Sequence, residues 1–534
     1  MKRKIFVCAF IFALAFAGSA FAEILSGPGI AVVEVEGGKL QGYIRNGIYT
    51  YHGIQYAETE PFMPPVKVKP WDGVKLALNY GTMSPQSIKP EDDMFPVHYY
   101  WPLWEGRNYP QSSNCQNLNI WTPALDNAKR PVMVWLHGGG FQAGSSLAED
   151  VYDGGNLSRK GDVVVVSINH RLNVLGFLDI SAYGEEYRYS GNLGIMDIVA
   201  ALEWVRDNIA NFGGDPSNVT LFGQSGGGAK ILTLMGTPKA AGLFHKAIVQ
   251  SGAVELMGIT LPKKEASRRV AELTLSELGI SSSDVSRLGD LPFEVLNEAG
   301  NKAIAEAVKE GHAVFSWSPV ADGDFIPEDP VEGGFAEQSE NIPMMIGTVL
   351  NEWVSVPLVA NMAVNQSDNK NFWDESKTNE KLHERYGDKA DAIVRAFLKA
   401  YPYKKAGDAL YVDTRLRTGA LKTMNVKAGQ SAPVYAYVFT WETPVMGGYA
   451  MAYHCSELPF VFNNIALSEK ATGGGEKAQA LADKMSKAWV DFARTGNPGW
   501  EAYTQENGAT MLFDDESVLT HHHDDELMRL LTAE

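Results

Sequence analysis

The fold of this chain is decided by the stretch Val219-Thr220-Leu221-Phe222-Gly223-Gln224-Ser225-Gly226-Gly227. Its first four residues have the pattern of a buried strand and lead directly into a G-x-S-x-G pentapeptide, and the apolar segment 229–235 then has a helical pattern. A strand, a sharp glycine-flanked turn and a helix form a nucleophile elbow, which projects its serine above a sheet. We therefore predict that Ser225 is a catalytic nucleophile. The competing interpretation is a glycine-rich turn with an incidental serine, whereas a P-loop is excluded because no Gly-Lys-[Ser/Thr] follows.

Short β-branched runs alternate with helical patterns on both sides of this stretch. Further strand patterns lie at 131–136, 163–167, 247–249, 344–346 and 434–439. A helical pattern over 198–209 ends at a pair of glycines, which favour helix C-termini. Alternation of this kind predicts an α/β fold with a large, mostly parallel sheet covered by helices. Residues 265–315 and 366–425 are richer in charge and are predicted to be helical excursions from the sheet.

A glycine loop follows the strand pattern at 131–136. The loop is His137-Gly138-Gly139-Gly140, and it precedes Ser225 in the chain, as an oxyanion loop does in this kind of fold. Acyl transfer places negative charge on a carbonyl oxygen, and backbone N–H groups that point at this oxygen stabilise it. The N–H of Gly226, directly after the serine, is predicted to be a further donor. Taken alone, the loop is equally compatible with a flexible glycine turn.

A serine nucleophile needs a histidine that takes its proton and an acid that holds the histidine. In this fold the chain order is serine, acid, histidine, so only histidines late in the chain qualify. His383 lies in a charged helical pattern, and His521 to His523 lie in a polar segment where adjacent side chains point in different directions. This leaves His454, in a loop among aromatic residues, as the predicted base. Adventitious metal binding at 521–523 is the less favoured interpretation, and no metal or cofactor is predicted.

The predicted acid is Glu352, a short loop after the strand pattern at 344–346. This places it near the carboxyl end of the sheet, where ligands bind in open α/β folds. Asp322 and Asp324 compete for the role, but they lie in a Pro/Gly-rich segment that suits a turn. With a histidine as base, the reaction rate is expected to fall in acid near pH 6–7, the ordinary range for a histidine pKa.

Composition and the N-terminal segment further limit the possible partners and location of the protein. The 534 residues are 45% hydrophobic and 21% charged, with a formal net charge of −18, which is typical of a soluble globular protein and disfavours nucleic acid and anionic membranes as partners. Residues 1–22 combine a basic start, a short apolar run and Ala20-Phe21-Ala22, the pattern of a secretory signal peptide. We therefore expect an exported protein, periplasmic or secreted, without a stable membrane anchor. An N-terminal anchor is less favoured, because the apolar run is short for a span of about 20 residues.

Ordered matches along nearly the whole chain resemble the type-B carboxylesterases, the family that includes cholinesterases and para-nitrobenzyl esterases. They lie at 52–57 (HGIQYA), 115–121 (CQNLNIW), 169–171 with 176–178, 192–216, 250–252 (QSG), 322–323 and 492–496 (FARTG). The resemblance implies an α/β-hydrolase fold in one domain over 23–534 and a small-molecule ester as substrate. It implies Ser225, Glu352 and His454 as the catalytic triad. It also implies Gly139, Gly140 and Gly226 as oxyanion donors.

The chain departs from the family pattern close to each of these residues. Gln224 stands where the family usually has Glu, and Gly226 stands where it usually has Ala. Trp353 and Cys455 each replace a Gly. A further departure is Ser84, at the position where the family often has a cysteine that pairs with Cys115, so we expect a free thiol at 115.

The resemblance also suggests residues that line the substrate pocket. Gln224 lies next to the nucleophile, Phe315 and Trp317 resemble positions of the acyl pocket, and aromatic residues between 95 and 109 resemble a loop at the gorge mouth. For each aromatic, core packing is the plainer explanation. Together they indicate a neutral, partly apolar or aromatic ester as substrate. The alternatives are a lipase that acts on longer chains and a non-catalytic binding protein on the same fold.

Overall fold

The computed structural model describes residues 23–87, 109–148, 150–353 and 368–533. One sheet of twelve strands runs through this part of the chain. In spatial order its strands are β1 (Ile24–Leu25), β4 (Tyr43–Arg45), β5 (Ile48–Gln55), β9 (Asn117–Thr122), β11 (Val164–Ile168), β10 (Arg130–Leu136), β12 (Gly214–Gln224), β13 (Lys246–Gln250), β14 (Met344–Val349), β15 (Val434–Phe439), β16 (Ala509–Phe513) and β17 (Val518–His521). The α/β architecture predicted from the sequence is confirmed.

The middle of the sheet, from β11 through β10 and β12 to β16, is parallel, and both ends are antiparallel. Every strand pattern recognised in the sequence lies in this parallel region. The sequence patterns missed the other strands of this sheet, which are β1, β4, β5, β9, β16 and β17. The reason is visible in β9, where Asn117 and Asn119 are buried and hydrogen-bonded inside the protein, so that no continuous apolar run marks the strand.

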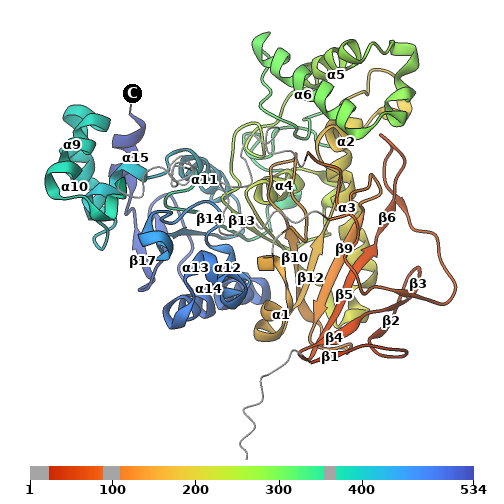
Figure 1. Ribbon diagram of the computed structural model, residues 1–534, viewed down its shortest axis with the longest axis horizontal. Helices are drawn as coiled ribbons and strands as arrows, with labels where there is room; N and C mark the ends of the chain where they lie inside the picture. Colours follow the sequence, from red (N-terminus) through yellow and green to blue (C-terminus); the bar gives the residue numbers. More distant parts are fainter. Residues whose placement is uncertain (1–22, 88–108, 149, 354–367, 534) are drawn as a thin grey trace, which may run out of the picture.

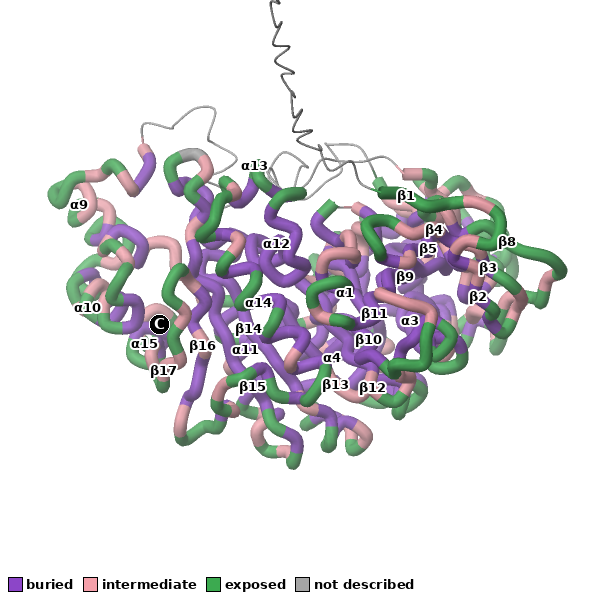
Figure 2. Tube along the Cα trace, turned by 90° about the horizontal axis from the view of Figure 1, so that it is seen from below, coloured by how far each residue is buried: buried purple, intermediate pink, exposed green. Residues whose placement is uncertain are grey.

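Helices cover both faces of the sheet, and each face has its own hydrophobic core. Successive strand residues point to opposite faces, so that Leu221 of β12 packs in one core and Phe222 in the other. The first core includes α3 (Leu193–Asn208), α4 (Gly226–Met235) and α11 (Arg415–Lys427), and the second includes α1 (Gly155–Gly161), α12 (Leu458–Val461) and α14 (Gly475–Thr495). Figure 2 shows the result, with buried residues concentrated along the strands and exposed residues on the outer helices and turns.

The remaining elements lie around this sheet (Figure 1). They are α2 (Asn173–Phe177), α5 (Lys264–Leu278), α6 (Phe293–Lys309), α9 (Glu375–Tyr386), α10 (Ala390–Ala400), α13 (Glu469–Thr472) and α15 (Asp525–Thr532), with two small sheets made by β2 (Val32–Val35), β3 (Gly38–Gln41) and β8 (Val74–Leu76) and by β6 (Ala57–Glu58) and β7 (Val66–Lys67). The pair α5 and α6 and the pair α9 and α10 lie on opposite sides of the molecule, in the two stretches richer in charge.

Two predictions fall outside the described residues. The signal-peptide segment 1–22 is one, so that export stays a prediction from the sequence. The aromatic stretch before Tyr109 is the other. Within the described ranges, no helix has both the length and the apolar character needed to cross a bilayer.

Candidate active site

Ser225 lies at a sharp turn between β12 and α4, with φ 55° and ψ −124°. Such a left-handed backbone is strained for a residue with a side chain, and strain of this kind is common at functional sites. The turn fits only because its neighbours are glycines. A Cβ atom on Gly227 would lie 1.9 Å from the carbonyl oxygen of Leu136, and one on Gly223 would lie 2.7 Å from the backbone of Gly227. The elbow predicted from the pentapeptide is therefore present.

The glycine loop at the end of β10 packs directly on this elbow. A Cβ atom on Gly226 would lie 2.5 Å from the nitrogen of Gly140, which is far inside van der Waals contact. This approach explains why glycine stands at 226, where the family pattern has alanine. Gly139 and Gly140 both have positive φ, at 86° and 62°, a conformation that glycine adopts without a steric penalty.

Three backbone donors belong to the glycine loop and to the elbow on which it packs. The N–H groups of Gly139, Gly140 and Gly226 have no acceptor among the residues that the structure describes. In contrast, the carbonyl of Gly139 accepts from the nitrogens of Gln142 (3.2 Å) and Ala143 (3.0 Å), which closes the loop into a turn. Unpaired donors of this kind can stabilise an oxyanion.

His454 and Glu352 lie in two loops that the backbone joins together. The carboxylate oxygen Oε2 of Glu352 is 2.5 Å from Nδ1 of His454, and the nitrogen of His454 donates to the carbonyl of Glu352 at 3.2 Å. Next to this pair, Asn351 and Ala452 exchange two hydrogen bonds of 3.1 Å. Residues about 100 positions apart are thereby held together. With Glu352 ionised, the contact places the proton on Nδ1 and leaves Nε2 able to accept one.

The carboxylate of Glu352 is completely buried. Its second oxygen, Oε1, accepts from Ser251 Oγ at 2.7 Å and from the nitrogen of Val349 at 2.9 Å. Burial raises the pKa of Glu352, because the charged form loses hydration, and these two hydrogen bonds act in the opposite direction. The side chain is therefore fixed by three partners, so that it can orient the imidazole.

Three of the departures from the family pattern meet at His454. The ring of Trp353 stacks on the imidazole with a centroid distance of 4.0 Å. The amide nitrogen of Gln224 is 3.1 Å from Nε2 and 3.5 Å from Nδ1. When Nδ1 carries the proton, Nε2 accepts from the Gln224 amide at the shorter of these two distances. The amide oxygen of Gln224 accepts from Cys455 Sγ at 3.2 Å.

Ser225 Oγ has no hydrogen-bond partner among the described residues, and Ser225 is half-buried, whereas His454 is 2% exposed. Catalytic hydrogen bonds are often loose before substrate binds and tighten in the complex. A hydrogen bond between Ser225 Oγ and His454 is therefore expected in the substrate complex.

We expect the rate to fall at lower pH than an ordinary histidine would imply. Burial lowers the pKa of His454 below 6.5, because the imidazolium loses hydration, and the carboxyl groups of Glu457 and Asp413 oppose this with smaller effect. A base must be neutral to act, so that kcat/KM should stay on its plateau at pH 6.5 and fall only on further acidification. The measurement is kcat/KM for p-nitrophenyl acetate from about pH 4 to 8, followed at the isosbestic wavelength of p-nitrophenol. A half-maximal rate at or above pH 6.5 would contradict it.

A comparison with known families identifies the chain. The model described as "Carboxylesterase family" matches residues 30–529. The chain belongs to the carboxylesterase family. It is accordingly a carboxylic ester hydrolase with an α/β-hydrolase fold, as the sequence motifs predict.

Relatives of this carboxylesterase are similar over nearly their whole length. It is 33% identical to the para-nitrobenzyl esterase of Bacillus subtilis (strain 168), over 91% of this chain and 96% of the relative. It is 31% identical to the phenmedipham hydrolase of Pseudarthrobacter oxydans, with the same coverages. Among solved structures, an esterase of Clostridium hathewayi that can hydrolyse aliphatic aromatic polyesters is 38% identical, with a TM-score of 0.87 over 96% of this chain and 99% of that one. All three are hydrolases, which agrees with serine ester hydrolysis.

The other residues that the sequence offered for the acid and the base lie elsewhere in this carboxylesterase. Asp322 accepts from Asn192 and from backbone nitrogens of its own turn, and Asp324 pairs with Arg188 at the surface. His383 is exposed on α9. His521, His522 and His523 contact different partners, and within the described ranges no cluster of three or more His, Cys, Asp or Glu side chains forms a metal site.

The predicted pocket residues differ in their placement. Phe315 is 45% exposed, and the Arg415 guanidinium lies 5.5 Å from its ring. Trp317 is 3% exposed and donates from Nε1 to Asn301 at 2.9 Å. Gln224 is buried against His454. A pocket role for these side chains stays a prediction. Cys115 and Cys455 are both buried, and neither forms a disulfide within the described ranges, as expected for Cys115. Burial raises the pKa of the Cys115 thiol to about 12.

Two residues near the site were not predicted from the sequence. Ser251 is the middle residue of the motif at 250–252, and its hydrogen bond to Glu352 forms only where two separate loops meet. Lys230 lies in the apolar helical segment after Ser225, where a single charged residue was the available signal. It is fully buried, and burial lowers its pKa to about 7.

Proposed function

We propose that Ser225, His454 and Glu352 are the catalytic triad and that the N–H groups of Gly139, Gly140 and Gly226 form the oxyanion hole. The observation that carries this assignment is the 2.5 Å contact between His454 Nδ1 and Glu352 Oε2. It orients the base beside a serine that a strained elbow presents. The three unpaired N–H groups support the assignment independently.

The reaction follows from this geometry in two halves. Ser225 Oγ attacks the ester carbonyl while His454 Nε2 takes its proton, and the negative oxygen of the tetrahedral intermediate lies against the three N–H groups. His454 then gives the proton to the alcohol, the C–O bond to the alcohol breaks, and an acyl-enzyme remains. Water attacks the acyl-enzyme with His454 as base, and the acid leaves while Ser225 regains its proton.

The substrate that we propose is a neutral ester with an apolar or aromatic part. The net charge of −18 disfavours long-range attraction of anionic substrates. The similarity to an esterase that can hydrolyse aliphatic aromatic polyesters supports the same class. We infer that an ester between an aromatic acid and an aliphatic alcohol is a suitable model substrate.

A panel of esters tests this proposal. We expect turnover of p-nitrophenyl acetate and butyrate and of a bis(hydroxyalkyl) terephthalate, with rates that fall for dissolved p-nitrophenyl esters of long acids. A neutral substrate should exceed its monoacid analogue in kcat/KM, because acidic surface charge repels the anion. A preference for emulsified long-chain esters would instead support a lipase, and an absence of turnover on the whole panel would contradict esterase activity on this substrate class.

A further inference from the structure

Lys230 is an unusual residue for its position, on the first turns of α4, five residues after Ser225. Its side chain is fully buried, and lysines are almost never fully buried unless they are paired. Within the described ranges, no carboxylate lies within ion-pair distance of its ammonium group. The buried ammonium group is therefore stabilised by hydrogen bonds and not by an ion pair.

Within the described ranges, both hydrogen bonds of Lys230 go to the glycine loop. Nζ donates to the carbonyl of His137 at 3.0 Å and to the carbonyl of Gly140 at 2.8 Å. Between them, the carbonyl of Gly138 accepts from His137 Nδ1 at 2.8 Å, and the carbonyl of Gly139 is held by the turn described above. All four carbonyls of the loop are thereby bound, and Lys230 binds the first and the last.

The direction of a carbonyl determines the direction of an N–H. A trans peptide unit is planar, so that its N–H points opposite to its C=O. The N–H groups of Gly139 and Gly140 belong to the two middle peptide units of the loop, and Lys230 holds the units on either side of them. The middle units are held through their own carbonyls, and Lys230 fixes the two flanking units, so that the ends of the loop cannot shift and carry the middle units with them.

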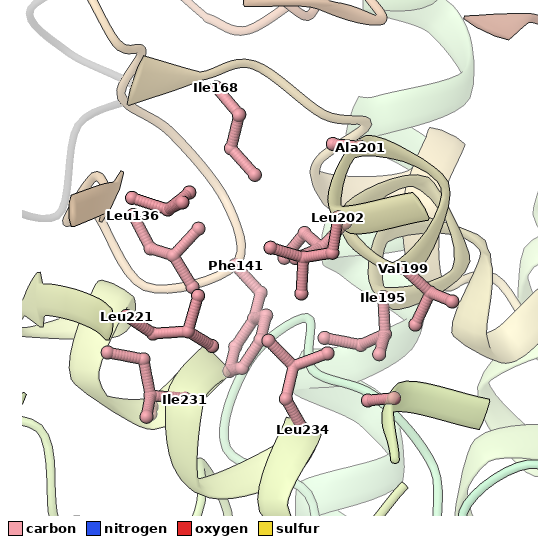
Figure 3. Close-up of a cluster of buried hydrophobic side chains, with 14 of the residues drawn as sticks. Leu136, Phe141, Ile168, Ile195, Val199, Ala201, Leu202, Leu221, Ile231 and Leu234 are labelled. Atoms are coloured by element: carbon pink, nitrogen blue, oxygen red, sulfur yellow. The ribbon is translucent and has the colours of Figure 1, made fainter. Parts of the chain in front are cut away.

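The residue after the loop anchors it on the same buried side. Phe141 is fully buried, and Figure 3 shows its ring among Leu221, Ile195 and Leu234 of the first core. Lys230 Nζ lies 5.4 Å from the centre of this ring. The loop is thus held from the protein interior, and its free N–H groups remain on the side of Ser225.

We propose that Lys230 is a positioning residue of the oxyanion hole, which holds the carbonyls of His137 and Gly140 so that the N–H groups of Gly139 and Gly140 face the substrate. The inference rests on the proposed function, because it takes these glycines as the oxyanion donors. On this proposal, Lys230 helps to stabilise the transition state and contributes little to binding of the intact ester.

The test replaces Lys230 by Met, which has a similar length and no donor, and uses Lys427→Met as the matched control. Lys427 is also fully buried and donates to a backbone carbonyl, that of Ser339 at 2.7 Å, but it bonds to no residue of the candidate site. For Lys230→Met we expect kcat for p-nitrophenyl butyrate to fall about 10²-fold, the size of effect when one oxyanion donor is lost, with KM within about threefold. Lys427→Met should keep the kcat of its folded fraction.

Inhibitors separate a positioning role from a merely structural one. A trifluoromethyl ketone adds to a catalytic serine and places an oxyanion in the hole, whereas a carboxylate product binds without one. We expect the Ki of the ketone to rise about 10²-fold in Lys230→Met, in parallel with kcat, and the Ki of the product to stay unchanged. Concentrations are to be normalised to sites counted by the p-nitrophenol burst.

Three outcomes overturn the inference. One is a kcat per site in Lys230→Met within threefold of the wild type. The second is equal losses in Lys230→Met and Lys427→Met. The third is a rise in KM with kcat unchanged. If Lys230→Met does not yield folded protein, Lys230→Gln decides, because it keeps one donor and should lose less kcat with the same unchanged product Ki. Turnover that survives in Ser225→Ala would instead refute the proposed function, so that the two failures are distinguishable.

Discussion

Replacement of Ser225 by alanine is expected to abolish ester hydrolysis, with a loss of about 10⁶-fold in kcat, the size seen when the serine of a catalytic triad is removed. The fold should not change. Ser225 Oγ has no hydrogen-bond partner among the described residues, so that its loss leaves no buried group unpaired. The measurements are kcat and Tm of Ser225→Ala beside the wild type.

The control for this variant is Ser276→Ala on the exposed face of α5, which should leave both quantities unchanged. A fluorophosphonate probe adds a second readout. In the wild type its adduct should map to the peptide that contains Ser225, and in Ser225→Ala no adduct should form there. Turnover of Ser225→Ala within tenfold of the wild type, or a probe adduct on another serine, would show that the nucleophile is elsewhere.

Replacement of His454 by alanine should cost about as much kcat as the loss of Ser225, and the double variant should lose little more. The reason is that the members of a triad act as a unit, so that their contributions are not additive. The two single variants should differ in stability. His454→Ala removes the partner of a completely buried carboxylate, that of Glu352, and should lower the Tm, whereas Ser225→Ala should not.

The matched control is His383→Ala, which removes an exposed imidazole from α9. It should keep full activity and the wild-type Tm. If the Ser225 and His454 effects multiplied in the double variant, the two residues would act independently, and the triad assignment would fail. His454→Gln retains a side-chain amide in the same place, and it should be equally inactive, because an amide cannot take the proton of a serine.

The fold and the elbow at Ser225 were predictable because their information is local. An apolar run of four or more residues marks a strand buried on both faces, and the glycines around Ser225 are required by contacts of the elbow itself. Strands with buried polar residues, such as β9, were not predictable. Their polar side chains are satisfied by partners far along the chain, and the sequence does not show those partners.

By itself, the sequence determined the α/β class and the serine at its elbow, and it predicted a base and an acid from chain order. Only the tertiary structure decided how these parts act together. It brought His454 and Glu352 within 2.5 Å, gathered Gln224, Trp353 and Cys455 around one imidazole, and placed Lys230 against the glycine loop. The physical reason is the distance along the chain between the groups that interact. A turn depends on sterics between neighbouring residues, whereas pKa, hydrogen-bond direction and burial depend on groups that meet only when the chain has folded.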